Sequence, residues 1–172
     1  VLGSRGLGDV YKRQEQFRYL TEKLNGYITG AYIYNKMGLT EQVATTITIA
    51  TPNPVRRFRF KNLDIECVKA YCMVYPDESL VPYLRLLDAI KDMKRIPGTT
   101  GQDIYNRVKS QYFNGYSLPE LEKIVSLAKS YPPRVRKVVA DILGDIRQTV
   151  LQTEMAKTIL PTTRFNLDYK TA

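Results

Sequence analysis

Apolar side chains near the beginning of the chain recur with a helical spacing. Phe17, Leu20 and Leu24 are separated by three and four positions, which predicts a helix over Glu15–Leu24. Asn25-Gly26 directly follows and is typical of a helix end. The first fourteen residues show neither a helical nor a strand period and contain three glycines. They are therefore predicted to be a disordered extension.

A short helix and then a strand are expected next. Thr29 is a candidate N-cap for a helix that runs through Met37, and Gly38 suits the left-handed residue that ends it. Thr45–Thr51 is rich in β-branched residues that alternate in polarity, which predicts a strand. Pro52-Asn53-Pro54 then indicates a turn.

The next alternating run carries a dense group of basic residues. In Arg56–Phe60 the two phenylalanines share one face and Arg57 and Arg59 share the other. Lys61-Asn62 suits a tight hairpin, because Asn tolerates positive φ. Leu63, Ile65 and Cys67 then alternate with Asp64 and Glu66 in a further strand. These runs predict a small antiparallel sheet of three or so strands with one wet face.

The pattern is helical from Pro76 onward. Apolar stripes separated by Pro97-Gly98, Asn114-Gly115 and Pro132-Pro133 indicate a series of helices. Ser117 and Glu120 have the spacing of a capping box at the start of one of them. The last stripe, from Val135 to Val150, predicts a helix of several turns. The fold class is therefore α+β, with a small antiparallel sheet and a helical C-terminal half.

The chain is expected to contain a single domain. Residues 1–14 are similar to translated adapter sequence at the ends of unrelated reading frames, and they are interpreted as an artefact or a disordered extension. The domain spans residues 15–160, and residues 161–172 form an extended tail. A length of 172 residues suits one domain with a core that needs no disulfides.

Composition removes several classes of function. The chain has no histidine, so Ser–His and Cys–His nucleophile pairs and imidazole metal sites are excluded. The two cysteines, Cys67 and Cys72, are interpreted as plain thiols of a cytoplasmic protein. No run of about 18 apolar residues indicates a membrane span. The 26 basic and 17 acidic residues give a charge of +9, which favours an anionic partner such as nucleic acid or an acidic protein surface.

Two basic clusters are candidate binding sites. Arg56, Arg57, Arg59 and Lys61 lie along one strand and could contact a phosphate backbone. The alternative is an edge strand protected by outward charges, partly paired with the acidic residues of the next strand.

Arg134, Arg136 and Lys137 form the second cluster, at the start of a helix. Positive charge there opposes the helix dipole, which hints at an anionic partner, although a solvated turn also explains it.

A metal-dependent nuclease is the enzymatic alternative. Asp64 and Glu66, with Lys69, would place carboxylates and a cation on one hairpin. However, the two acids alternate with apolar residues, as on the wet face of a strand. Their spacing to the lysine is Glu-x-x-Lys, not the Glu-x-Lys of that nuclease class. The chain is therefore predicted to be non-enzymatic, with no metal and no cofactor.

Several short motifs resemble one known family. They include the Thr29-Gly30-Ala31 helix start, Gly38–Val43 before the first predicted long strand, Leu86–Asp92 and Tyr131–Arg136. Together they cover roughly residues 15 to 145 and are similar to AbiEi-type antitoxins, the transcriptional regulators of abortive-infection (type IV) toxin–antitoxin systems in phage defence.

The resemblance implies a function and its partners. Members of this family combine an N-terminal winged-helix DNA-binding domain with an antitoxin domain, act against a nucleotidyltransferase-like toxin and repress their own promoter. This chain resembles the antitoxin domain, and its residues before Glu15 do not have the pattern of a winged helix. The expected partners are therefore promoter DNA in a full-length protein and the toxin. A protein-only interaction module is a further alternative.

Overall fold

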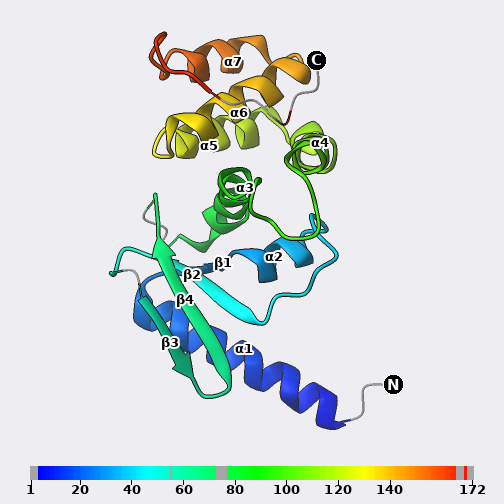
Figure 1. The fold of residues 1–172 in the computed structure, drawn as a ribbon, viewed down its shortest axis with the longest axis vertical. Coiled ribbons are helices and arrows are strands. Elements are labelled where there is room, and N and C mark those ends of the chain that lie inside the picture. Colours follow the sequence, from blue (N-terminus) through cyan, green and yellow to red (C-terminus); the bar gives the residue numbers. More distant parts are fainter. Residues whose placement is uncertain (1–3, 55, 73–76, 166–168, 170–172) are drawn as a thin grey trace.

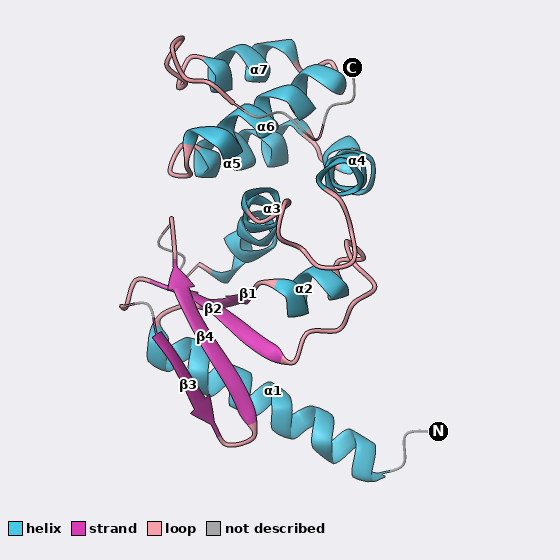
Figure 2. Ribbon diagram, viewed as in Figure 1, coloured by secondary structure: helices cyan, strands magenta, loops and turns pink. Residues whose placement is uncertain are grey.

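The computed structural model is an α+β fold built around one four-stranded sheet (Figure 1). It describes residues 4–54, 56–72, 77–165 and 169. Figure 2 shows the sheet near one end of the molecule and a group of helices at the other. The elements are α1 (Ser4–Leu24), β1 (Tyr27–Thr29), α2 (Ala31–Lys36), β2 (Thr46–Thr51), β3 (Arg56–Phe60), β4 (Leu63–Lys69), the 3₁₀ turn η1 (Glu78–Leu80), α3 (Val81–Lys91), α4 (Gly101–Gln111), η2 (Phe113–Gly115), α5 (Leu118–Ala128), α6 (Pro133–Asp145) and α7 (Thr149–Ala156).

The sheet is mixed, so the prediction of a three-stranded antiparallel sheet was wrong. Its strand order is β1-β2-β4-β3. β1 pairs antiparallel with β2, β2 pairs parallel with β4, and β3 pairs antiparallel with β4. The prediction followed chain order and paired each strand with its neighbour in the sequence. In the structure β4 lies between β2 and β3.

The amphipathic character of the strands explains this order. β4 buries Leu63, Ile65 and Cys67 and occupies a central position, whereas the arginine-rich β3 lies at the edge. At the edge of the sheet the cations of β3 deter pairing with other chains. The β3–β4 hairpin forms as predicted, but the positive φ in its turn, 54°, belongs to Lys61 and not to the expected Asn62.

Two layers of helices enclose the sheet. The C-terminal half of α1 covers one face, where Leu20 and Leu24 pack with Ile47, Ile49 and Ile65. On the opposite face β1 meets α3, as Figure 1 shows. The larger core lies between α3 and the helices α4 to α7. α3 is therefore the link between the sheet and the helical half.

The first helix begins earlier than predicted. α1 starts at Ser4, so residues 4–14 are helical where the sequence suggested a disordered extension. The described side chains from Gly8 to Glu15 are exposed. Because this part of α1 buries no face, its sequence has no apolar period. It is helical because it continues the packed turns that follow it in the same helix.

The last predicted stripe is divided between two helices. α6 ends at Asp145, and Arg147, with a φ of 64°, reverses the chain into α7. Val150, which continues the predicted stripe, is 80% exposed, while Leu151 and Met155 are buried. The capping box of α5, in contrast, is as predicted, with both of its reciprocal hydrogen bonds between Ser117 and Glu120.

Tyr169, in the segment predicted to be an extended tail, packs against the domain. Tyr169 is buried, stacks on Tyr105 with ring centroids 4.9 Å apart, and donates a hydrogen bond to Asp141. These contacts connect Tyr169 to α4 and α6. No helix among the described residues is both long and apolar enough to cross a membrane.

Thr29 does not cap α2. It belongs to β1, and Gly30 takes the N-cap position with φ 79° and ψ −168°. A Cβ atom at Gly30 would lie 2.5 Å from Thr48 Oγ1 on the neighbouring strand. Glycine is therefore required twice, by the backbone conformation and by the close approach of β2.

We predict that Gly30→Ala destabilises the chain by about 1–3 kcal/mol or more, because this backbone region is essentially restricted to glycine. Gly101→Ala is the matched control, since an added Cβ at the start of α4 meets nothing within 4 Å. It should be neutral or slightly stabilising. Urea denaturation of the three proteins measures the difference, and equal stability of both variants would contradict the role of Gly30.

Candidate functional site

Four basic side chains lie on and beside the outer edge strand. We call Arg56, Arg57, Arg59 and Lys61 the β3 surface. All four are exposed, and β3 has a neighbour in the sheet on only one side. The first predicted cluster is therefore brought together on an accessible edge of the sheet.

Two of these cations are paired with acids of the next strand. Arg57 lies opposite Glu66 with an Nη2–Oε1 distance of 3.3 Å, and Arg59 lies opposite Asp64 with an Nη1–Oδ1 distance of 3.5 Å. The arginines remain 79% and 67% exposed. This is the arrangement expected of a protected edge strand. Exposed ion pairs of this kind contribute about 0–1 kcal/mol, so they compete only weakly with another anion.

The other two cations lie on aromatic rings. The Arg56 guanidinium is 4.7 Å from the centroid of Phe58, and the Lys61 ammonium is 5.6 Å from that of Phe60. Neither Arg56 nor Lys61 forms an ion pair with an acidic residue in the part of the chain that the structure describes. The β3 surface thus retains uncompensated positive charge.

The second predicted cluster is built into the fold. Arg136 Nε donates to the carbonyl of Tyr131 over 3.1 Å, and its Nη1 donates to the carbonyl of Thr158. Lys137 Nζ lies 3.1 Å from Asp141 Oδ1. Both side chains are half-buried. The Arg136 contacts join α6 to neighbouring segments, whereas the Lys137–Asp141 pair lies within α6. A ligand would have to break these contacts to bind here.

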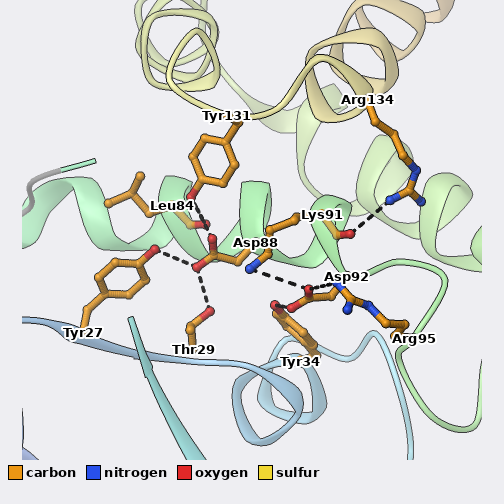
Figure 3. A network of polar contacts seen from close by, with 10 residues as sticks. All are labelled: Tyr27, Thr29, Tyr34, Leu84, Asp88, Lys91, Asp92, Arg95, Tyr131 and Arg134. Carbon is orange, nitrogen blue, oxygen red and sulfur yellow. Dashed lines mark hydrogen bonds and ion pairs between the residues drawn. The ribbon is translucent and has the colours of Figure 1, made fainter. Parts of the chain in front are cut away.

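Arg134 explains how a basic residue is accommodated at the start of α6. Its Nη1 donates to the Lys91 carbonyl over 3.2 Å, at the C-terminal end of α3 (Figure 3). That end of a helix carries partial negative charge, which favours a cation. The remaining Nε and Nη2 atoms are buried and have no hydrogen-bond partner among the described residues.

A buried carboxylate at the middle of α3 accepts hydrogen bonds from three hydroxyl groups, which come from two segments of the chain. Asp88 is 2% exposed. Its Oδ2 accepts hydrogen bonds from Tyr27 (2.7 Å) and Thr29 (2.8 Å) of β1, and its Oδ1 accepts one from Tyr131 (2.7 Å), just before α6. Figure 3 shows the three hydroxyls converging on the carboxylate. Asp88 therefore connects the sheet to the helical half.

Burial controls the protonation of this cluster. It raises the pKa of Asp88 above its ordinary value, although the hydrogen bonds from Tyr27, Tyr131 and Thr29 act in the opposite direction. Burial and the nearby Asp88 charge also raise the pKa of Tyr27 and of Tyr131, so both phenols keep the protons that they donate. The sequence analysis missed Asp88, although a carboxylate between Leu84, Leu87 and the other apolar residues of this stripe was a readable signal.

One turn beyond Asp88, at the C-cap of α3, a second acid faces a small pocket. Asp92 Oδ2 accepts a hydrogen bond from Tyr34 over 2.7 Å, and Asp92 Oδ1 lies 3.6 Å from Lys91 Nζ and 3.5 Å from Arg95 Nη2. The pocket has a volume of about 250 Å³, and Thr48 and Glu66 of the sheet form part of its wall. Its acidic and basic side chains largely offset one another, so it shows no clear charge preference.

The nuclease alternative gains no support from the geometry. Asp64 and Glu66 face Arg59 and Arg57, and Lys69 lies over the ring of Tyr71 with a distance of 5.1 Å to the centroid. Among the described residues, no group of three Cys, Asp or Glu side chains is placed to hold a metal ion. Cys67 and Cys72 are free, and burial raises the pKa of each thiol.

Comparisons with known proteins identify no relative. No family model, no curated protein and no solved structure matches this chain.

We predict that Asp88→Asn destabilises the fold by about 1–3 kcal/mol. The asparagine keeps one acceptor oxygen where three hydroxyl donors converge, and its amide group leaves buried hydrogen bonds unmade. Glu122→Gln is the control, because it neutralises an exposed acid on α5. Thermal and urea denaturation measure the effect, and equal stability of the two variants would exclude a structural role for the Asp88 cluster.

The raised pKa of Asp88 predicts that the stability of the fold depends on pH. Its pKa in the folded chain is raised by burial above the value of about 4 expected in the unfolded chain. The protonated form therefore stabilises the fold below about pH 4, and this contribution is lost as the pH rises through the folded-state pKa. As the pH rises from about 4 through the folded-state pKa, the free energy of unfolding should fall relative to that of Asp88→Asn. A difference that stays constant with pH contradicts the raised pKa.

Proposed function

We propose that this chain is a non-enzymatic regulator of the AbiEi antitoxin type, which binds nucleic acid through phosphate contacts of its β3 surface. The exposed position of these four cations on an edge strand is the observation that carries the proposal. The sequence motifs that resemble AbiEi-type antitoxins supply the biological role, including a nucleotidyltransferase-like toxin as the functional partner.

The charge balance around β3 favours an anionic partner. Between Arg56 and Lys69 the chain has five basic and two acidic residues. The two acids already face arginines, and Arg56 and Lys61 remain without an acidic partner among the described residues. Arginine side chains in this setting can donate two hydrogen bonds to one phosphate group.

Contacts of this kind determine affinity more than sequence preference. Phosphate oxygens are the same at every position of a nucleic acid, so cations that bind them orient the protein without reading bases. In a full-length regulator with a winged helix, that domain would recognise the promoter and the β3 surface would add affinity. An acidic protein surface is the alternative partner, because it presents carboxylates at similar spacing.

We predict a steep salt dependence of nucleic-acid binding. If the β3 surface replaces counterions, the logarithm of the affinity should fall linearly with the logarithm of the salt concentration, by about 0.9 per phosphate contact on duplex DNA. Fluorescence anisotropy with a labelled oligonucleotide at several salt concentrations measures this slope. An affinity that does not change with salt, or no binding at low salt, would contradict the proposal and favour a protein partner.

The double variant Arg56→Gln/Lys61→Gln should reduce the salt slope by about 2 and weaken binding of all sequences similarly, because two phosphate contacts are lost. The matched control is Lys157→Gln/Arg164→Gln. It removes the same charge from two exposed residues in the C-terminal region, which is distant from β3 (Figure 1). Equal loss of affinity in both double variants would indicate an effect of net charge alone and would contradict a defined β3 surface.

A further inference from the structure

Two aromatic rings from distant parts of the sequence form a stacked pair on the side of the sheet that α1 covers. Tyr19 of α1 and Phe60 at the end of β3 have ring centroids 5.4 Å apart and ring planes inclined by 14°. Phe60 is half-buried, but Tyr19 is 49% exposed. A large aromatic side chain held in a fixed orientation and left accessible is typical of a surface that receives a planar ligand.

A lysine lies over each of the two rings. The Lys23 ammonium is 5.5 Å from the centroid of Tyr19, and the Lys61 ammonium is 5.6 Å from that of Phe60. Exposed contacts of this type contribute about 0.5–1 kcal/mol, so a ligand can displace the lysines at small cost. Once displaced, each ammonium group is still within reach of an anion beside the ring, because lysine side chains are long and flexible.

The pair forms one wall of a groove between α1 and the β3–β4 turn. We call it the Tyr19 groove. It has a volume of about 370 Å³ and is lined by Lys12, Glu15, Gln16, Tyr19, Phe60 and Lys61. This volume is within the range of about 300–1,000 Å³ that small-molecule sites occupy. The lining combines an aromatic wall, an amide side chain, one carboxylate and two ammonium groups, so its charged side chains sum to +1. An aromatic wall beside a net positive charge suits a flat ring attached to a phosphate.

We propose that the Tyr19 groove binds an unpaired nucleotide of a single-stranded nucleic acid. The base stacks on the Tyr19–Phe60 pair, and Lys61 and Lys23 contact the adjoining phosphates. This inference rests on the proposed function and names its substrate class, since Lys61 belongs to both the groove and the β3 surface. Bases of a duplex are already stacked on their neighbours and cannot reach the rings, so single strands are favoured.

Three labelled oligonucleotides of equal length separate stacking from phosphate contact. One is single-stranded and free of self-pairing, one is the corresponding duplex, and one is a single strand of abasic sites that keeps the phosphates and lacks the bases. In fluorescence anisotropy the unmodified chain should bind the base-bearing single strand at least about fivefold more tightly than the abasic strand, because each stacked base contributes about 1–3 kcal/mol. It should also prefer this single strand to the duplex.

Tyr19→Leu and Phe60→Leu remove the stacking rings and keep apolar bulk in place. Each should weaken binding of the base-bearing single strand about fivefold or more and leave binding of the abasic strand unchanged. Tyr32→Leu is the matched control, because that ring also has a lysine over it, Lys36 at 5.4 Å, but does not line the groove. It should bind like the unmodified chain, and circular dichroism verifies that all variants fold.

The outcomes distinguish this inference from the proposed function. If the abasic and base-bearing strands bind equally, or if the groove variants bind single strands normally, the Tyr19 groove receives no base, while phosphate binding by the β3 surface still stands. A clear preference for the duplex overturns the inference in the same way. If none of the oligonucleotides binds at low salt, both proposals fail.

Discussion

The fold depends on a carboxylate that is removed from water and accepts hydrogen bonds from hydroxyl groups. Asp88 lies in the middle of α3, and its partners come from β1 on one side and from the segment before α6 on the other. A buried polar group is tolerated only when its hydrogen bonds are made, so the three donors must stay where they are. This requirement fixes how the helical half sits against the sheet and, through β1, holds the sheet to which β3 belongs.

The candidate surface is a consequence of strand order. β4 buries one apolar face and lies between β2 and β3, which leaves β3 with one free side and exposes Arg56, Arg57 and Arg59 to solvent. The alternation of β3 then gives its two faces different properties. One face pairs its arginines with acids of β4, and the other packs phenylalanines toward α1 and carries Arg56 over Phe58. Aromatic rings and cations therefore meet where β3 and α1 are neighbours.

The basic cluster on β3 is exposed, as its sequence pattern indicates, whereas the cluster at the start of α6 is half-buried. Arg56 to Lys61 are adjacent in the chain and lie on a strand whose alternation is readable, so their common exposure could be predicted. Arg134 and Arg136 form an equally dense cluster, yet they donate to carbonyls of Lys91 and Thr158, far away in the sequence. Tyr19 was not considered, because its stacking partner Phe60 lies 41 positions later and local spacing carries no sign of that contact.

Local patterns in the sequence determined the α+β class, the β3–β4 hairpin, the capping box of α5 and the positive charge, because each depends on residues a few positions apart. The tertiary structure alone decided the position of β4 between β2 and β3, the division between α6 and α7, and the convergence of hydroxyls on Asp88. These features depend on which apolar faces cover one another after the chain has collapsed. The choice among possible arrangements depends on packing between segments that are distant in the sequence, and the periodicity of the sequence carries no information about it.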